Sequence, residues 1–148
     1  MPHFGLMDEK ELGPVEGPLF RTRLHIRSGR RRLRQGKTAA GIATLADALS
    51  SAFQWYLAAH DLGDALEVRA DDNLNDDLTV YQILVRTGVL DGAFDFEDFD
   101  LLVERALDDD TEGIDEDEFL QDLEGIMRQL GVMPFDEGAL PAEDPNTY

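Results

Sequence analysis

The sequence predicts an all-α fold, a helical bundle of about five helices that opens with an antiparallel helical hairpin. Apolar residues recur at spacings of three and four along several stretches, as they do on one face of an α-helix. Aspartates precede these stretches and glycines follow them, in the manner of helix caps. The chain has 148 residues, of which 43% are hydrophobic, so it can form a single domain with its own core.

The first sixty residues predict an irregular arm followed by the hairpin. Residues 1–18 contain three prolines and three glycines, which favours irregular structure. The first helix is expected from about Pro18 to Gln35, with Gly36 as its stop. The second is expected from Thr38, as a cap, to about His60, because an apolar stripe runs along it.

Three further helices are expected beyond the polar residues 61–77. The third helix begins at Asp76 or Asp77 and ends by Gly88. Asp95 and Asp115 precede the fourth and fifth, and each is followed three residues later by another acid. A carboxylate in the first turn stabilises a helix because it interacts favourably with the positive helix end.

These elements divide the chain into three parts. Residues 1–18 are expected as the irregular N-terminal arm and residues 19–133 as a single helical domain. Residues 134–148 contain three prolines and no basic residue, so they are expected as an extended acidic C-terminal tail, either solvated or lying over the bundle.

The two halves of the chain carry opposite charge. Residues 1–60 hold nine Lys or Arg against five Asp or Glu, a net charge of +4. Residues 61–148 hold four basic against twenty-seven acidic side chains, a net charge of −23. An imbalance of this kind concerns partners and solubility rather than a reaction, so we expect a protein partner with a basic surface.

The composition also argues against several classes of protein. Cysteine is absent, so there is no disulfide framework and no thiolate site, which suits a cytoplasmic location. Polar residues interrupt the longest apolar stretch, residues 39–59, so no membrane span is expected. The chain has no glycine-rich phosphate loop, no nucleophile motif and no grouped histidines, so we expect neither an enzyme nor a cofactor.

The basic residues of the first half gather on the first predicted helix. A guanidinium can bind a phosphate, but it also suits a carboxylate in a bidentate pair. Because the whole chain is strongly acidic, pairing with the acidic half, within the chain or across a dimer, is the more economical interpretation than nucleic-acid binding. The residues that could contact a partner or a phosphate are Arg27, Arg30, Arg31 and Arg34.

Residues 108–119 resemble the calcium-binding loop of an EF-hand. Calcium takes about six to eight oxygen ligands, which clustered carboxylates and a turn glycine can supply. Ile114 directly follows Gly113, however, so the loop is one residue short of the EF-hand pattern and its later ligands change phase. An acidic turn before a capped helix explains the same residues. The metal-ligand candidates are Asp108, Asp110, Glu112, Asp115 and Glu118.

Residues 33–37 (Leu-Arg-Gln-Gly-Lys) lie between two predicted helices, and residues 45–49 (Leu-Ala-Asp-Ala-Leu) precede an aromatic end at Trp55. With these features, residues 19–60 resemble the opening hairpin of HEPN-type and nucleotidyltransferase-substrate-binding helical bundles. Many HEPN proteins are ribonucleases that use an Arg, a short polar spacer and a His, and no His follows His60 here. The resemblance therefore implies a bundle that dimerises or binds a partner, without the nuclease.

The sequence leads to one main functional hypothesis and two alternatives. The main one is a non-enzymatic protein–protein interaction module, a homo-oligomer and most simply a homodimer, whose acidic half binds a basic surface. The first alternative is a calcium-responsive domain that uses residues 108–118. The second is a HEPN-like nucleotide- or RNA-binding bundle without nuclease activity.

Overall fold

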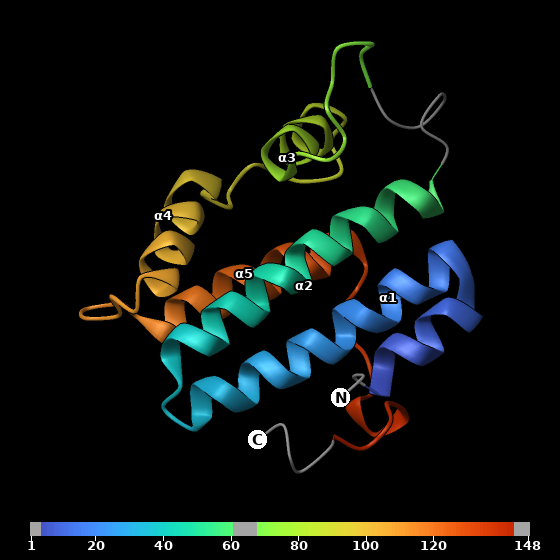
Figure 1. The fold of residues 1–148 in the computed structure, drawn as a ribbon. Coiled ribbons are helices and arrows are strands. Elements are labelled where there is room, and N and C mark those ends of the chain that lie inside the picture. Colours follow the sequence, from blue (N-terminus) through green and yellow to red (C-terminus); the bar gives the residue numbers. More distant parts are fainter. Residues whose placement is uncertain (1–3, 61–67, 144–148) are drawn as a thin grey trace.

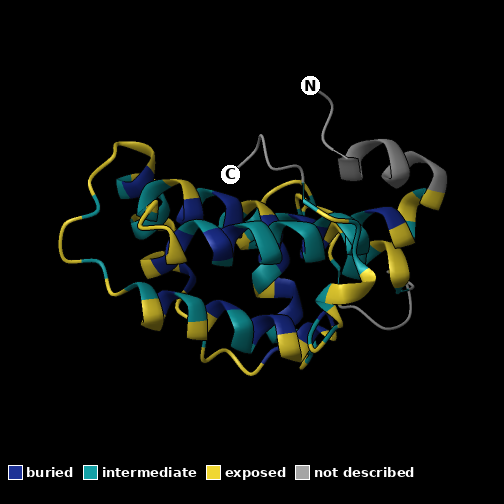
Figure 2. Cartoon of the chain, turned by 90° about the horizontal axis from the view of Figure 1, so that it is seen from below, coloured by how far each residue is buried: buried dark blue, intermediate teal, exposed yellow. Residues whose placement is uncertain are grey.

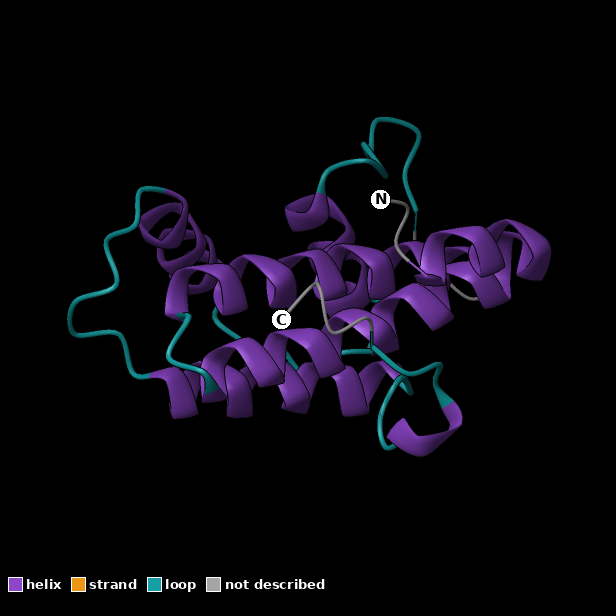
Figure 3. Ribbon diagram, turned by 60° about the horizontal axis from the view of Figure 1, so that its bottom comes forward, coloured by secondary structure: helices purple, strands orange, loops and turns teal. Residues whose placement is uncertain are grey.

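A computed structural model describes residues 4–60 and 68–143, and within these ranges the protein is helical and has no strand (Figures 1 and 3). The all-α prediction is confirmed. The elements are α1 (Phe4–Arg34), α2 (Thr38–Ala59), α3 (Asp77–Arg86), α4 (Phe96–Leu107), α5 (Glu116–Leu130) and a 3₁₀ turn (Glu137–Ala139).

Helix α2 is the centre of the fold. It forms its most extensive contact with α1, which lies alongside it in the expected antiparallel hairpin, and it also contacts α3, α4 and α5 (Figure 1). The side chains of Ile42, Leu45 and Ala48 are completely buried, and those of Leu49 and Phe53 are 1% exposed. The stripe that predicts α2 is therefore the surface on which the other helices pack.

The buried residues of the other helices face this stripe, so one continuous core runs through the molecule (Figure 2). Ile26 of α1, Ile83 of α3 and Ile126 of α5 are each at most 1% exposed. None of the helices in the described residues combines the length and apolar character of a membrane span.

Two glycines let α1 and α2 approach closely. A Cβ placed on Gly29 of α1 would lie 2.5 Å from Cγ of Leu45, which is completely buried in α2. A Cβ placed on Gly41 of α2 would lie 2.6 Å from Cδ2 of Leu33 and 3.2 Å from its backbone nitrogen. Each glycine thus receives a leucine of the opposite helix. An interior glycine lowers the stability of a helix, but here it allows the two helices to pack closely.

The N-terminal arm differs from the prediction. Residues 4–18, expected as irregular, are helical, and the two helical parts of α1 meet at a kink. Gly13 adopts φ +90° there, in the left-handed region that glycine enters without steric cost. Pro14 then begins the second part, where a missing N–H is tolerated. The prolines and glycines therefore divide a helix rather than prevent one.

The later helices begin where the sequence predicts. The side chains of Asp76, Asp95 and Asp115 accept hydrogen bonds from the backbone N–H three residues on, as N-caps of α3, α4 and α5. Thr38 differs, because it is the first residue of α2 rather than its cap, and its hydroxyl bonds with the Glu116 carboxylate. Residues 61–67 of the expected polar segment lie outside the described residues.

The C-terminal segment, residues 134–143, lies over the bundle. This is one of the two arrangements expected for the tail. Its 3₁₀ turn interrupts the extended course predicted for residues 134–148. Phe135 lies under the guanidinium of Arg23, whose Cζ is 5.4 Å from the ring centroid. Arg23 also donates to the carbonyl of the buried Val132, at 3.2 Å from Nη2. Residues 144–148 of the tail lie outside the description.

The close contact between α1 and α2 can be tested at its glycines. Gly29→Ala should lower the free energy of unfolding by about 1–3 kcal/mol, because the new methyl group overlaps the buried Leu45. Chemical denaturation measures this change.

Gly125→Ala is the matched control, since a Cβ on this glycine of α5 meets nothing within 4 Å. It should raise the free energy of unfolding by about 0.4–1 kcal/mol. Equal stabilisation of both variants would contradict the close packing of α1 on α2.

Candidate functional site

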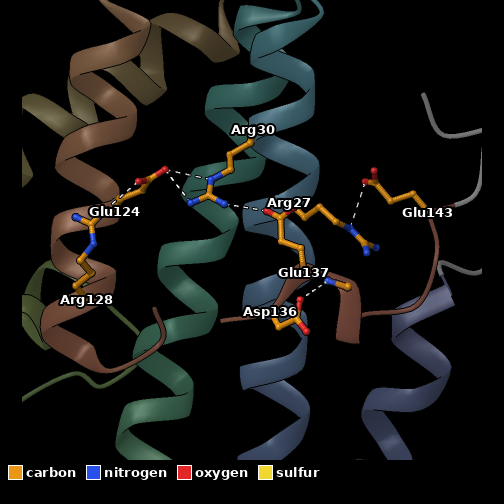
Figure 4. A network of polar contacts seen from close by, with 8 residues as sticks. Arg27, Arg30, Glu124, Arg128, Asp136, Glu137 and Glu143 are labelled. Carbon is orange, nitrogen blue, oxygen red and sulfur yellow. Dashed lines mark hydrogen bonds and ion pairs between the residues drawn. The ribbon is translucent and has the colours of Figure 1, made fainter. Parts of the chain in front are cut away.

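Arg30 connects α1 to two other parts of the chain (Figure 4). Its Nη2 lies 2.9 Å from Oε1 of Glu124 on α5, and its Nη1 lies 2.8 Å from Oε1 of Glu137 in the 3₁₀ turn. The side chain is 20% exposed and that of Glu124 is 19% exposed. Arg128, one turn beyond Glu124 on α5, also pairs with it, but its side chain is 58% exposed.

A single carboxylate of the C-terminal segment accepts the next group of contacts. Glu143 pairs with Arg31 and lies 3.9 Å from Nε of Arg27. The hydroxyl of Ser28 donates to the same oxygen over 2.9 Å. Both guanidinium groups are largely buried, so their charge is matched where water has little access.

The four arginines singled out in the sequence therefore have different surroundings. Arg27, Arg30 and Arg31 pair with glutamates of the acidic half within the same chain. Arg34 is exposed at the end of α1 and forms no ion pair with a described residue. Three of the four candidates for partner or phosphate contact thus already bind a carboxylate.

The acidic surplus lies elsewhere, on α4, on the loop after it and on the first half of α5. Residues 95–122, here called the acidic segment, contain fourteen Asp or Glu and one basic residue, Arg105. Asp95 and Asp115 cap helices, Asp110 pairs with Arg105, and Glu116 accepts from Thr38. The other ten are exposed and form no ion pair with a described residue: Glu97, Asp98, Asp100, Glu104, Asp108, Asp109, Glu112, Asp117, Glu118 and Asp122.

The five metal-ligand candidates lie in this segment but do not surround one point. In the part of the chain that the structure describes, no group of three or more His, Asp or Glu side chains is arranged to hold a metal ion. The Asp115 carboxylate accepts from the backbone N–H of Glu118 as a helix cap. Asp108, Glu112 and Glu118 are exposed.

Arg105, in the last turn of α4, is the basic residue that lies next to the stretch resembling a calcium loop. Its Nε lies 3.2 Å from Oδ2 of Asp110, and its Nη2 donates to the backbone carbonyl of Glu112. A guanidinium therefore contacts three oxygens of the stretch that resembles a calcium loop. Calcium binding here stays a prediction from the sequence.

Between α4 and α5 lies a partly open cavity of about 190 Å³. Both helices pack on α2, and residues of both line the cavity. Its apolar lining consists of Phe94, Phe99, Leu102, Ile114 and Phe119. Its carboxylates are Asp95, Asp98, Asp115, Glu118 and Asp122, and Arg105 lies against it as well.

Stacked aromatic rings form the base of the cavity. The rings of Phe99 and Phe119 are nearly parallel, with an interplanar angle of 8° and centroids 5.4 Å apart. Phe94 packs against Phe99 with centroids 5.3 Å apart. Phe99 and Phe119 are 7% and 3% exposed, so the rings belong to the core and also line the cavity.

The sequence alone does not predict this cavity. Of its carboxylates, Asp95 and Asp115 are expected before helices, and Asp115 and Glu118 are expected as metal-ligand candidates. One signal could have found it. Both helices begin with the same pattern, an Asp, two further residues, an acid and a Phe: Asp95 to Phe99 and Asp115 to Phe119. The shared pattern places equivalent side chains on the two helices that face each other.

Partial burial and neighbouring negative charges shift the pKa of Asp100, which lies in the acidic segment. Burial raises the pKa of the Asp100 carboxyl, and the negative charges of Glu104, Asp77 and Asp76 raise it further. The folded state therefore binds the proton of Asp100 more tightly than the unfolded chain does. Ionised Asp100 reduces stability at neutral pH.

The ion pairs of α1 can be tested by comparing two partners of Glu124. Arg30→Ala should lower the free energy of unfolding by about 1–3 kcal/mol, because the largely buried Glu124 loses its less exposed cation and Glu137 loses its ion pair. Arg128→Ala removes an exposed partner of Glu124 and should cost only about 0.3–0.5 kcal/mol. Urea unfolding measures both, and equal losses would show that Arg30 does not connect the segments.

The Asp100 shift predicts a pH-dependent gain in stability. Asp100→Asn should raise the melting temperature at about pH 7 because it removes the ionised form. The gain should fade as the pH falls from the raised pKa of the folded state toward the ordinary aspartate pKa of about 3.9, and it should vanish below that value, where both states are protonated. Thermal unfolding across this range provides the measurement. Glu97→Gln, an exposed change in the first turn of α4, is the control, and a gain that persists in acid would argue against repulsion.

Comparison of the chain with protein-family models, with curated proteins and with solved structures gives no match. The resemblance of residues 19–60 to HEPN-type bundles accordingly stays a prediction.

Proposed function

We propose that the protein is a non-enzymatic interaction module that binds a basic surface of a protein partner through the acidic segment, residues 95–122. One observation carries the proposal. Ten exposed carboxylates of this segment form no ion pair with a described residue, whereas the α1 arginines Arg27, Arg30 and Arg31 are paired within the chain. The negative charge is available to a partner and much of the positive charge is not.

The placement of these carboxylates favours binding by electrostatic attraction. Exposed charges of one sign raise the rate at which an oppositely charged partner arrives, and they disfavour partners of the same sign. A polyanion such as RNA would approach a molecule of net charge −19. It would also have to displace Glu143 and Glu137 from Arg27, Arg30 and Arg31. A basic protein surface meets neither obstacle.

The homo-oligomer expected from the sequence stays a prediction, which light scattering addresses. A two-fold dimer built on the acidic segment would bring like charges together. A second copy would therefore have to use another face, and the acidic segment would remain accessible to a basic partner.

Binding to a basic polymer tests the proposed function. Labelled poly-lysine should bind the full chain and should bind about tenfold more weakly when the salt concentration rises from about 50 to about 500 mM, because salt screens exposed charges. Fluorescence anisotropy measures the affinity. No binding at low salt, or an affinity that salt does not change, would refute the proposal.

Paired substitutions locate the effect. Asp108→Asn with Asp109→Asn removes two charges from the acidic segment and should weaken poly-lysine binding. Asp47→Asn with Asp71→Asn removes two exposed charges outside that segment and should weaken it less. Equal weakening would mean that binding follows net charge and not the acidic segment.

A further inference from the structure

We propose that the cavity between α4 and α5 receives a lysine or arginine side chain from a basic peptide segment of the partner. The inference rests on the proposed function and adds the chemistry that the partner must present. Its basis is that the cavity combines an aromatic base with a rim of carboxylates, so it suits a cation on a long apolar stem.

The size of the cavity favours a single side chain. Its volume is about 190 Å³, whereas sites for drug-sized ligands and cofactors typically occupy about 300–1,000 Å³. A lysine or arginine stem can pack along apolar surface while its charged end stays near water or a counter-ion. The Phe99 and Phe119 rings supply that apolar surface.

The rim selects for positive charge. Five carboxylates line the cavity against one guanidinium, that of Arg105, which is turned to Asp110 and to the Glu112 carbonyl. The caps Asp95 and Asp115 already accept from the first-turn N–H groups of their helices. Asp98 and Glu118 add negative charge in those same turns and form no ion pair with a described residue.

Carboxylates on both helices also favour a cation in the cavity. Phe99 of α4 already stacks on Phe119 of α5 with both rings buried, whereas Asp98 and Glu118 line the same cavity as like charges. Like charges that line one cavity repel each other. A cation between Asp98 of α4 and Glu118 of α5 would remove that repulsion, and its stem would cover the apolar base. A bare metal ion fits less well, because no described group of three or more ligands is arranged for one.

The length of the basic side chain is the variable that tests the inference. Two labelled peptides of equal length and charge are compared on the full chain at about pH 6, one with lysines and one with 2,4-diaminobutyrate, whose shorter side chain carries the same ammonium. The lysine peptide should bind about fivefold more tightly, because only its stem reaches the aromatic rings. Fluorescence anisotropy gives both dissociation constants.

Matched variants separate the cavity from general attraction. Asp98→Asn with Glu118→Gln removes two charges that line the cavity, keeps both caps, and should abolish the preference for lysine. Glu97→Gln with Asp117→Asn removes two exposed charges from the same first turns outside the cavity, so it should weaken both peptides equally and keep the preference.

The outcomes distinguish this inference from the proposed function. If both peptides bind equally well to the unmodified protein, the acidic segment attracts basic partners but the cavity does not take a side chain. If neither peptide binds, the proposed function and the cavity inference both fail. A lysine preference that survives Asp98→Asn with Glu118→Gln also overturns the inference. The comparison on the unmodified protein stands even if a variant does not fold.

Discussion

The packing of every other helix on the apolar stripe of α2 is the constraint on which this structure depends. Gly29 of α1 packs against Leu45 of α2, and Gly41 of α2 packs against Leu33 of α1. This close contact between the two helices fixes the side of α1 that faces away from the core. The arginines Arg27 and Arg30 extend from that helix toward α5 and the C-terminal segment (Figure 4). Helices α4 and α5 pack on the same central helix, meet at Phe99 and Phe119, and line the cavity between them. Packing and charge placement are thus consequences of one arrangement.

The opposite charges of the two halves are used in two ways. Glu124, Glu137 and Glu143 pair with the α1 arginines and attach α5 and the C-terminal segment to the hairpin. The pairs of Glu124 and Glu143 have limited access to water, so they act as specific contacts as well as neutralising charge. Ten carboxylates of the acidic segment form no ion pair with a described residue, and burial together with the charges of Glu104, Asp77 and Asp76 raises the pKa of Asp100. A strongly charged surface therefore coexists with a well-packed core, because the unpaired charges lie on the outside of α4 and α5.

Local chemistry explains which parts of the fold the sequence predicts well. The starts of α3, α4 and α5 depend on the caps Asp76, Asp95 and Asp115 and on an adjacent apolar face, so a short window contains the necessary information. Residues 4–18 were predicted wrongly because Gly13 and Pro14 mark a break between two helical parts as readily as an irregular arm. The charges predict that the arginines pair with the acidic half, but they do not identify the partner of each arginine. Arg30 and Glu124 are separated by 94 positions, and no local pattern connects them. The cavity depends on how α4 and α5 pack on α2, and the spacing of apolar residues along one helix does not predict such an arrangement.

The attachment of the C-terminal segment gives the chain an internal counter-ion. Glu137 and Glu143 reach Arg30, Arg27 and Arg31 from a stretch that carries little buried apolar surface of its own, apart from Val132 at its start. A chain cleaved after Met133 would lose both carboxylates, and Glu124 of α5 would still pair with Arg30. Limited proteolysis in this stretch would thus remove negative charge beside the α1 arginines and leave the acidic segment unchanged.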